Sequence, residues 1–401
     1  MAGLNTRKAR VLEGAKRSRL TTRASVHLDM IRGAAAMAVL VGHVRGLFFL
    51  TYHRLPRRNA ALAAMYAVTG LGHQAVVVFF VLSGFFIVSS VLDSMAKAQW
   101  SWKTYLVNRI VRLSLVLAPA LVITWIADRA GEAMAASAAF YQKPLTYFFS
   151  VSPASLDSLR NFFGNLFYLQ GILVQPFGSN GPLWSLSYEF WYYLLFPLLL
   201  CAWIKRYRPA TRGICLALAL IAAWFVGETI AMYFLLWLLG GAIACSFSRQ
   251  KLPLRTSYAG LLAIIAFVAA LALSVTRTVE TLFFMDSIVA LGFAVWMYVL
   301  VIREEKFVPR AYDKTARLFA GFSYTLYAVH FPLLILIRAR FVGDQVWAPD
   351  WLHFFFGVVI ATAALAIAWA IAQVTEAKTA AVRRMVMHLL PDTTRPGAHN
   401  S

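Results

Sequence analysis

Long apolar stretches alternate with short polar ones along almost the whole chain. Many windows of about 20 residues carry almost no charge, which is the length and composition that an α-helix needs to cross a bilayer. Lipid leaves no water for unpaired backbone groups, so such stretches form helices. We therefore expect an all-α fold, a polytopic transmembrane helix bundle. The pattern predicts about ten spans, over residues 28–50, 73–95, 110–128, 183–204, 212–227, 229–247, 257–275, 281–302, 318–338 and 351–375.

The polar segments between these stretches carry most of the positive charge. The 401 residues are 60% apolar and have a formal net charge of +21. In a soluble protein this charge would suggest nucleic acid, but short basic loops such as "KRYR" and "RQKLPLR" follow the positive-inside rule. We therefore expect contact with membrane lipids and no nucleic-acid partner. With the N-terminal tail inside, most Lys and Arg face the cytoplasm, and both termini are cytoplasmic.

The two ends of the chain and one long loop complete the expected organisation. Residues 1–27 are a basic cytoplasmic tail, since they hold no apolar core followed by a small-residue cleavage site. Residues 28–375 form the transmembrane domain, and residues 376–401 form a second cytoplasmic tail. The loop over about 129–182 faces outside and is rich in turn residues, as a lid or the rim of a binding site would be.

The three cysteines lie in separate apolar runs and show no CxxC spacing. We interpret Cys201, Cys215 and Cys245 as packing residues, so the sequence supports neither a disulfide framework nor a metal site.

One arginine and one histidine stand inside the first expected span, in "RGAAAMAVLVGH". Arg32 and His43 are eleven residues apart, so they return to within about 20° of the same helix face, about 16 Å apart along the axis. Arg32 could simply extend to the inner membrane surface, and His43 could be satisfied by a neighbouring helix. An ionisable group that deep more often marks a pathway or a reaction centre.

Two further polar groups lie in the next spans. "FFVLSGFFI" places Ser83 and Gly84 in mid-span, where close helix packing is the simplest interpretation. "YLVNRIVRL" sets Arg109 and Arg112 three apart on one face, near the cytoplasmic entrance. Positive-inside charge explains that pair by default, although two guanidinium groups on one face also suit a phosphorylated ligand.

Two later segments add acidic, aromatic and histidine side chains. In "GPLWSLSYEFWYYLLFP", Ser185 and Glu189 share a face that we place near the outer side, where a structural ion pair is the alternative for the glutamate. "GFSYTLYAVHFP" gives Tyr324, Tyr327 and His330 at spacings of three, for which a buried tyrosine–histidine hydrogen bond is the alternative. Together the five segments describe a polar path across an apolar bundle.

In combination these segments resemble the membrane-bound acyltransferase-3 family, the bacterial O-acyltransferases that modify envelope glycans. The matching stretches are "LDMIRG" through His43, "FFVLSGFF", "NRIVR" followed by Pro119, "LWSLSYEFWYY" with Pro197, and "SYTLYAVHFP". They occur in the family's order and cover residues 28–332. Each stretch alone is weak, whereas all five in order are highly specific.

Departures from the family pattern are mild, namely Phe190 after the glutamate and Ala328 in place of a bulkier residue. The chain resembles the form without a fused extracytoplasmic esterase-like domain.

The resemblance implies a multi-pass enzyme of the bacterial cytoplasmic (inner) membrane. It implies transfer of an acyl group, usually acetyl from acetyl-CoA, to a hydroxyl of a carbohydrate, free or lipid-linked, or of a related acceptor. Acyl-CoA is then a donor substrate, and no tightly bound cofactor is expected. By position the resemblance assigns His43 and Glu189 as catalytic, Arg32, Arg109 and Arg112 to CoA, and Ser83, Trp184, Ser185, Tyr324, Tyr327 and His330 to the surrounding substrate site.

The chemistry of these residue types is consistent with that reaction. A histidine is a suitable general base for a hydroxyl that attacks a thioester, and arginines bind the phosphates of CoA through paired N–H donors. The sequence does not distinguish acetyl from succinyl or longer acyl groups, or lipopolysaccharide and exopolysaccharide from an acceptor such as a macrolide. A transporter or flippase also needs intramembrane charge, but the chain shows no repeat symmetry.

Overall fold

The computed structural model describes residues 22–134, 137–144, 151–247, 257–275, 278, 280–302 and 308–390. Most of the expected N-terminal tail, the end of the expected C-terminal tail and parts of the expected 129–182 loop lie outside these ranges. The long helices of the described chain are α2 (Thr22–Phe48), α4 (Gly72–Ala96), α5 (Trp102–Ala133), α9 (Trp184–Trp203), α10 (Pro209–Val226), α11 (Glu228–Phe247), α12 (Ser257–Ser274), α13 (Leu282–Ile302), α15 (Ser323–Phe341) and α16 (Trp351–Val374).

Shorter helices connect these elements. They are α3 (Ala60–Thr69), α6 (Ala138–Tyr141), α7 (Pro153–Leu156), α8 (Leu159–Leu166), α14 (Arg310–Ala320) and α17 (Thr379–Leu389), with 3-10 turns η1 (Tyr52–Arg54), η2 (Gly181–Leu183) and η3 (Glu376–Lys378). Among the described residues, extended pairing is limited to two isolated bridges.

The expected all-α transmembrane class is confirmed. Nine of the ten predicted spans each coincide with one long helix, and seven helices of the described chain are long and apolar enough to cross a membrane, or eight with one bent pair. A count of ten spans and the cytoplasmic position of both termini stay predictions. The helix α2 begins at Thr22, inside the expected tail, and α5 begins eight residues before the predicted span.

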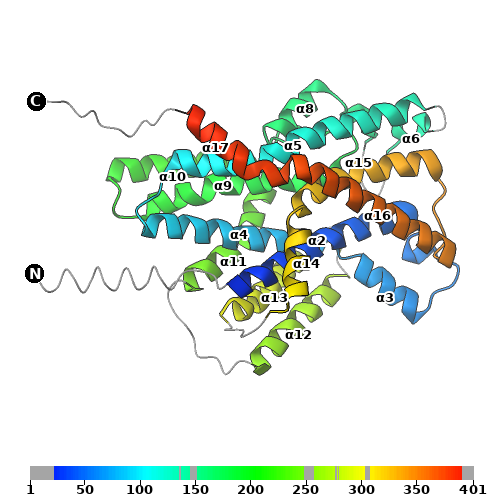
Figure 1. Cartoon of the computed structure of the whole chain (residues 1–401), viewed down its shortest axis with the longest axis horizontal. Helices are drawn as coiled ribbons and strands as arrows, with labels where there is room; N and C mark the ends of the chain where they lie inside the picture. The colour runs from blue at the N-terminus through cyan, green and yellow to red at the C-terminus, as the bar shows by residue number, and fades with distance from the viewer. Residues whose placement is uncertain are drawn as a thin grey trace, which may run out of the picture.

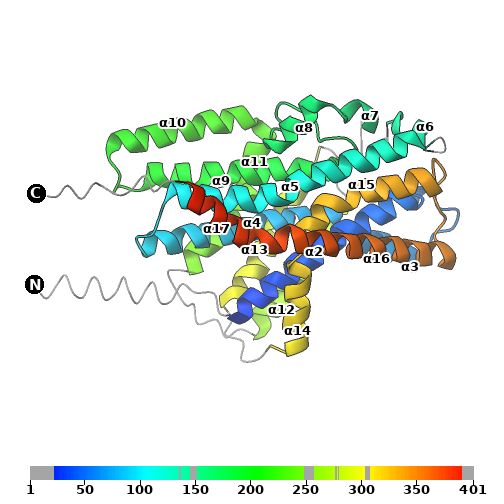
Figure 2. The same cartoon turned by 45° about the horizontal axis from the view of Figure 1, so that its top comes forward.

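The predicted span over 318–338 is wrong in one respect, because it is not one straight helix. The helices α14 and α15 meet at a 53° bend. Gly321 caps α14 by donating its backbone N–H to the Arg317 carbonyl at 2.9 Å. The helix α14 carries exposed charges, including an Arg317–Asp313 pair at 2.7 Å, whereas α15 is largely buried. The polar segment therefore turns away from the apolar one, and both figures show α14 standing across the long helices (Figures 1 and 2).

Close helix packing holds α4 in the middle of the bundle. A Cβ on Gly84 would lie 1.9 Å from the Trp237 carbonyl oxygen, and one on Gly240 would lie 1.9 Å from the Val81 carbonyl oxygen. Only glycine at these facing positions lets α4 and α11 approach so closely. The packing interpretation of Gly84 is thus confirmed, and the neighbouring Ser83 accepts a hydrogen bond from the Trp237 indole of α11 at 3.2 Å. In Figure 2 the helices α4, α5, α9 and α15 run roughly side by side.

Candidate active site

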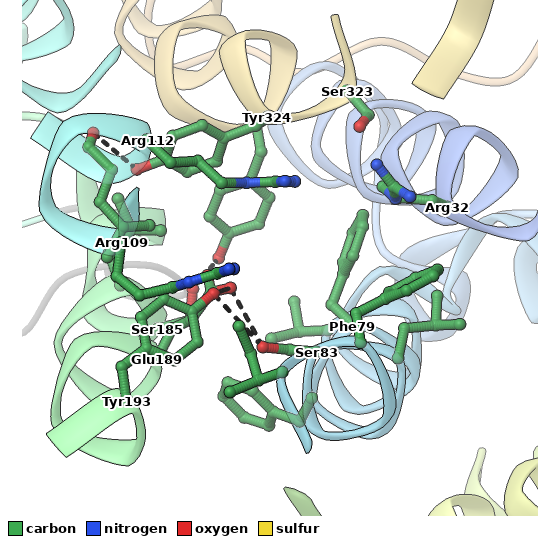
Figure 3. Close-up of a pocket in the computed structure, with 18 residues that line it drawn as sticks. Arg32, Phe79, Ser83, Arg109, Arg112, Ser185, Glu189, Tyr193, Ser323 and Tyr324 are labelled. Carbon is green, nitrogen blue, oxygen red and sulfur yellow. Dashed lines mark hydrogen bonds between the residues drawn. The ribbon is translucent and has the colours of Figure 1, made fainter. Parts of the chain in front are cut away.

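A cavity of about 200 Å³ lies between α2, α4, α5, α9 and α15. We call it the arginine cavity, because Arg32, Arg109 and Arg112 all line it. Figure 3 shows Arg109 and Arg112 reaching in from α5 and Arg32 reaching in from α2 on the opposite side. Its other polar lining residues are Ser83, Ser185, Glu189, Tyr193, Ser323, Tyr324 and Tyr327.

The contacts of the arginines differ. A guanidinium nitrogen of Arg32 donates to Asp29 at 2.7 Å, and the Arg32 guanidinium carbon lies 5.1 Å from the centre of the Phe86 ring. Arg109 lies over Tyr105 and Tyr193, and its Nε is a buried donor with no hydrogen-bond partner among the described residues. A buried N–H donor of this kind is costly, so it indicates a site that an anionic ligand would complete.

Glu189 belongs to the arginine cavity and is held by hydroxyl groups. Ser83 Oγ donates to Glu189 Oε1 at 3.2 Å, Tyr193 donates to the same oxygen, and the Trp237 indole donates to Ser83 Oγ at 3.2 Å. The sequence placed Glu189 near the outer side and assigned it a catalytic role beside that of His43, but the two residues line different cavities. Helical spacing is a property of one helix, so it cannot reveal that Glu189 of α9 and His43 of α2 line different cavities.

A second cavity, of about 470 Å³, lies beyond the first along α4 and α15. We call it the histidine cavity, because His43 and His73 line it together with Trp184 and Gln175. Residues of the expected 129–182 loop form much of its wall, including Leu156, Gly171 and Pro176.

The hydrogen bonds behind His43 determine its tautomer. His330 is fully buried, and its Nδ1 lies 2.8 Å from the Leu326 carbonyl oxygen, which can only accept. Nδ1 of His330 therefore carries the proton, and in the neutral ring Nε2 is an acceptor. That nitrogen lies 2.8 Å from Nδ1 of His43, which must then donate. A neutral His43 consequently has its lone pair on Nε2, the form that a general base requires.

Tyr327 and Val76 line both cavities and so form the partition between them. The Tyr327 hydroxyl donates to the Pro182 carbonyl at 2.8 Å, which leaves it to accept from Ser185 Oγ at 2.6 Å. The alternative of a hydrogen bond between Tyr327 and His330 is therefore not supported, since His330 bonds His43 and Leu326. Tyr324 has a separate partner, the Leu113 carbonyl at 3.1 Å.

The wall segment of the histidine cavity is fixed to α5 and α15. Asp128 accepts from the Ser179 backbone N–H at 2.7 Å, and the Asn180 amide donates to Thr124 Oγ1 and to the Ala328 carbonyl. Gly178 has φ +54°, and a Cβ there would lie 2.3 Å from Asp128 Oδ2. Glycine is therefore required where the loop meets the carboxylate.

A surface ion pair supports the same wall next to Leu156. Arg129 contacts Asp157 at 2.9 Å, with side-chain exposures of 55% and 4%. Burial raises the pKa of the Asp157 carboxyl above its usual value, and the Arg129 guanidinium partly offsets this rise.

Two features of the site were not expected from the sequence. Asp29 neutralises Arg32 from three residues away, a spacing that could have signalled the pair. His73 Nε2 lies 2.7 Å from Asp286 Oδ2, and Tyr233 donates to the same oxygen at 2.5 Å. His73 and Asp286 are 213 positions apart. The available signal in the sequence was that His73 begins one predicted span and Asp286 lies inside another.

The residues that line both cavities fall within the part of the chain that a known family profile covers. The profile of the acyltransferase-3 family, described as an acyltransferase domain, matches residues 26–372. The chain belongs to this family. No curated protein and no solved structure matches it. The protein is therefore a multi-pass membrane acyltransferase that transfers groups other than amino-acyl groups, and the transporter alternative is rejected.

Proposed function

We propose that this acyltransferase moves an acetyl group from acetyl-CoA across the bacterial cytoplasmic membrane to a hydroxyl of an envelope or secreted carbohydrate. The observation that carries the proposal is the pairing of two cavities with different chemistry. One is lined by three arginines, the other by a histidine base, and Tyr327 and Val76 separate them.

The arginine cavity suits the donor. Guanidinium groups bind phosphate through paired N–H donors, and Arg109 Nε has no protein partner among the described residues. The cavity volume of about 200 Å³ is smaller than that of pockets for drug-sized ligands, which run from about 300 to 1000 Å³. The cavity therefore takes the pantetheine arm, with the arginines holding the phosphates at its mouth, on the cytoplasmic side that the loop charges favour.

The histidine cavity suits the acceptor. It is the larger of the two, and its lining combines aromatic side chains with a few polar groups, as is usual for a binding site. His43 Nε2 takes the proton of the acceptor hydroxyl, whose oxygen forms a bond to the thioester carbonyl carbon. The carbon–sulfur bond then breaks, and the proton passes to the departing CoA sulfur.

Glu189 is assigned a role on the donor side, since it shares the cavity with the arginines. Fixed by Ser83 and Tyr193, it orients the neighbouring cationic groups. This role differs from the catalytic one that the resemblance assigns to Glu189. Direct transfer requires the thioester to pass Tyr327 towards His43, and an extended arm can cover the roughly 16 Å between Arg32 and His43.

Two experiments test the proposal. Mass spectrometry of envelope glycans from cells with and without the gene identifies the ester and its acyl group. In inverted vesicles, radiolabelled acetyl-CoA added to the cytoplasmic face should label glycan enclosed in the lumen. Labelling only of glycan added outside contradicts transfer across the membrane. A succinyl or longer ester, or an ester on a non-carbohydrate acceptor, contradicts the stated donor or acceptor.

A further inference from the structure

The histidine cavity contains a second ionisable group that the reaction described above does not use. His73 lies at the start of α4 and lines the cavity with 23% of its side chain exposed. Behind it, Asp286 of α13 is fully buried and accepts hydrogen bonds from His73 Nε2 and from the Tyr233 hydroxyl.

We propose that His73, oriented by Asp286, is an acceptor-binding residue that positions a carbohydrate hydroxyl in front of His43. This inference deepens the proposed function and rests on it. The chemical class of the ligand is a polyhydroxylated ring, which offers several hydroxyl groups close together. When one hydroxyl of the ring binds His73, the orientation of the ring determines which other hydroxyl reaches His43.

The geometry of the ring favours binding over a purely structural role. Asp286 occupies Nε2, so the imidazole is fixed with Nδ1 as the remaining nitrogen for a ligand. The Trp184 indole stacks on the same ring, with centroids 6.3 Å apart and planes at 20°, and also lines the cavity. A locked imidazole beside an aromatic face presents both a polar and an apolar surface to a sugar.

Burying the Asp286 carboxylate costs free energy, so this residue is a poor means of holding helices together. Its Oδ1 has no hydrogen-bond partner among the described residues. Replacing a buried ion pair by packed apolar groups is often neutral or stabilising. The stability of the fold therefore does not require the His73–Asp286 pair. Ionisable residues inside membrane helices usually serve a functional site.

The structure supplies a matched control at the start of α16. His353 lies 2.7 Å from Asp350 and stacks on Trp347, with centroids 5.2 Å apart and planes at 25°. His353 is thus also a histidine that pairs with an aspartate and stacks on a tryptophan, but it bonds through Nδ1 and does not line the histidine cavity.

The test measures steady-state transfer by detergent-solubilised full-length protein, with acetyl-CoA and polysaccharide extracted from cells that lack the gene. The variants are His73→Phe, which keeps a ring on Trp184, and His73→Phe/Asp286→Leu, which also removes the stranded carboxylate. A His73→Gln variant retains a donor for Asp286 and an acceptor for the ligand. Size-exclusion chromatography of each variant checks that it is folded.

We expect both phenylalanine variants to raise the KM for the polysaccharide about tenfold. The KM of His73→Gln should lie between that of these variants and that of the wild type. The KM for acetyl-CoA should change less than the KM for the polysaccharide, and nuclear magnetic resonance should show esters at altered ring positions. His353→Phe should match the wild type.

An unchanged KM for the polysaccharide in the folded double variant overturns the inference, as does an equal rise in the KM for acetyl-CoA. The proposed function fails only if the wild type itself forms no ester on any carbohydrate. Failure of the inference about His73 is therefore distinguishable from failure of the proposed function.

Discussion

His43 Nδ1 and His330 Nε2 lie 2.8 Å apart, although the two residues are 287 positions apart in the chain. The Leu326 carbonyl fixes the proton of His330, and His330 in turn fixes the proton of His43. The position of the reactive lone pair is thus determined by a backbone oxygen two hydrogen bonds away. This relay leads to the first prediction.

His330→Ala should lower the kcat of transfer about 10- to 1000-fold, because His43 loses the acceptor that holds its tautomer. His330→Gln should recover part of the rate, since its amide oxygen can accept from Nδ1. The measurement is kcat with saturating acetyl-CoA and glycan. In the double variant His43→Ala/His330→Ala, the loss should be no greater than in His43→Ala alone. Additive losses would show that the two histidines act separately.

The three arginines of the arginine cavity should act on donor affinity. Replacing Arg32, Arg109 or Arg112 by Gln should weaken acetyl-CoA binding about 10- to 100-fold, the cost of about 1.5–3 kcal/mol for a charge-assisted contact. Lysine should rescue only partly, because it cannot bind two phosphate oxygens in a planar fork. Isothermal titration measures the affinity.

Arg340 provides the control for this series, since it is exposed and lies outside both cavities. Arg340→Gln should bind acetyl-CoA like the wild type. If the three cavity variants do the same, their charges only set the orientation in the membrane.

The spans and most of the candidate residues could be predicted from the sequence, because apolar length and helical spacing are local properties. The division into two cavities could not. The resemblance assigns catalytic roles to both Glu189 and His43, but the Tyr327 partition that separates them depends on how α9 and α15 pack. The His73–Asp286 pair was missed for the same reason, as no local pattern links α4 to α13.

The α4–α11 contact predicts a difference between two glycines in stability. Gly84→Ala places a Cβ 1.9 Å from a backbone oxygen, so α4 and α11 must separate, at a cost of about 1–3 kcal/mol. Gly213 of α10 has no neighbour within 4 Å, so Gly213→Ala should stabilise its helix by about 0.5–1 kcal/mol. Thermal unfolding in detergent measures both. Equal midpoints for the two variants would contradict the packing described here.

The Arg129–Asp157 pair predicts a pH dependence. Burial raises the pKa of Asp157 in the folded state, so the folded protein favours the neutral carboxyl. The stability that this group contributes is therefore fully present below the ordinary pKa of an aspartate and is lost as pH rises through the pKa of the folded state. Asp157→Asn, which resembles the neutral acid, should therefore raise the thermal midpoint at a pH of about 8 and change it little at a pH of about 3. A larger rise in the thermal midpoint at the acidic pH would contradict this direction of the pKa shift. It would show that the ion pair with Arg129 outweighs burial.

Tyr327 should control the size of the acyl group, because its ring and Val76 separate the two cavities. Tyr327→Ala removes the ring and joins the cavities, so the ratio of kcat/KM for butyryl-CoA to that for acetyl-CoA should rise about tenfold or more, as expected when space for added methylenes opens. Tyr327→Phe keeps the ring but loses the bonds to Pro182 and Ser185, so this ratio should stay near that of the wild type while the protein loses about 1 kcal/mol of stability. Tyr258, with a side chain 80% exposed on α12, provides the alanine control. An unchanged ratio in Tyr327→Ala would mean that the acyl group reaches the acceptor by a route that does not pass this residue.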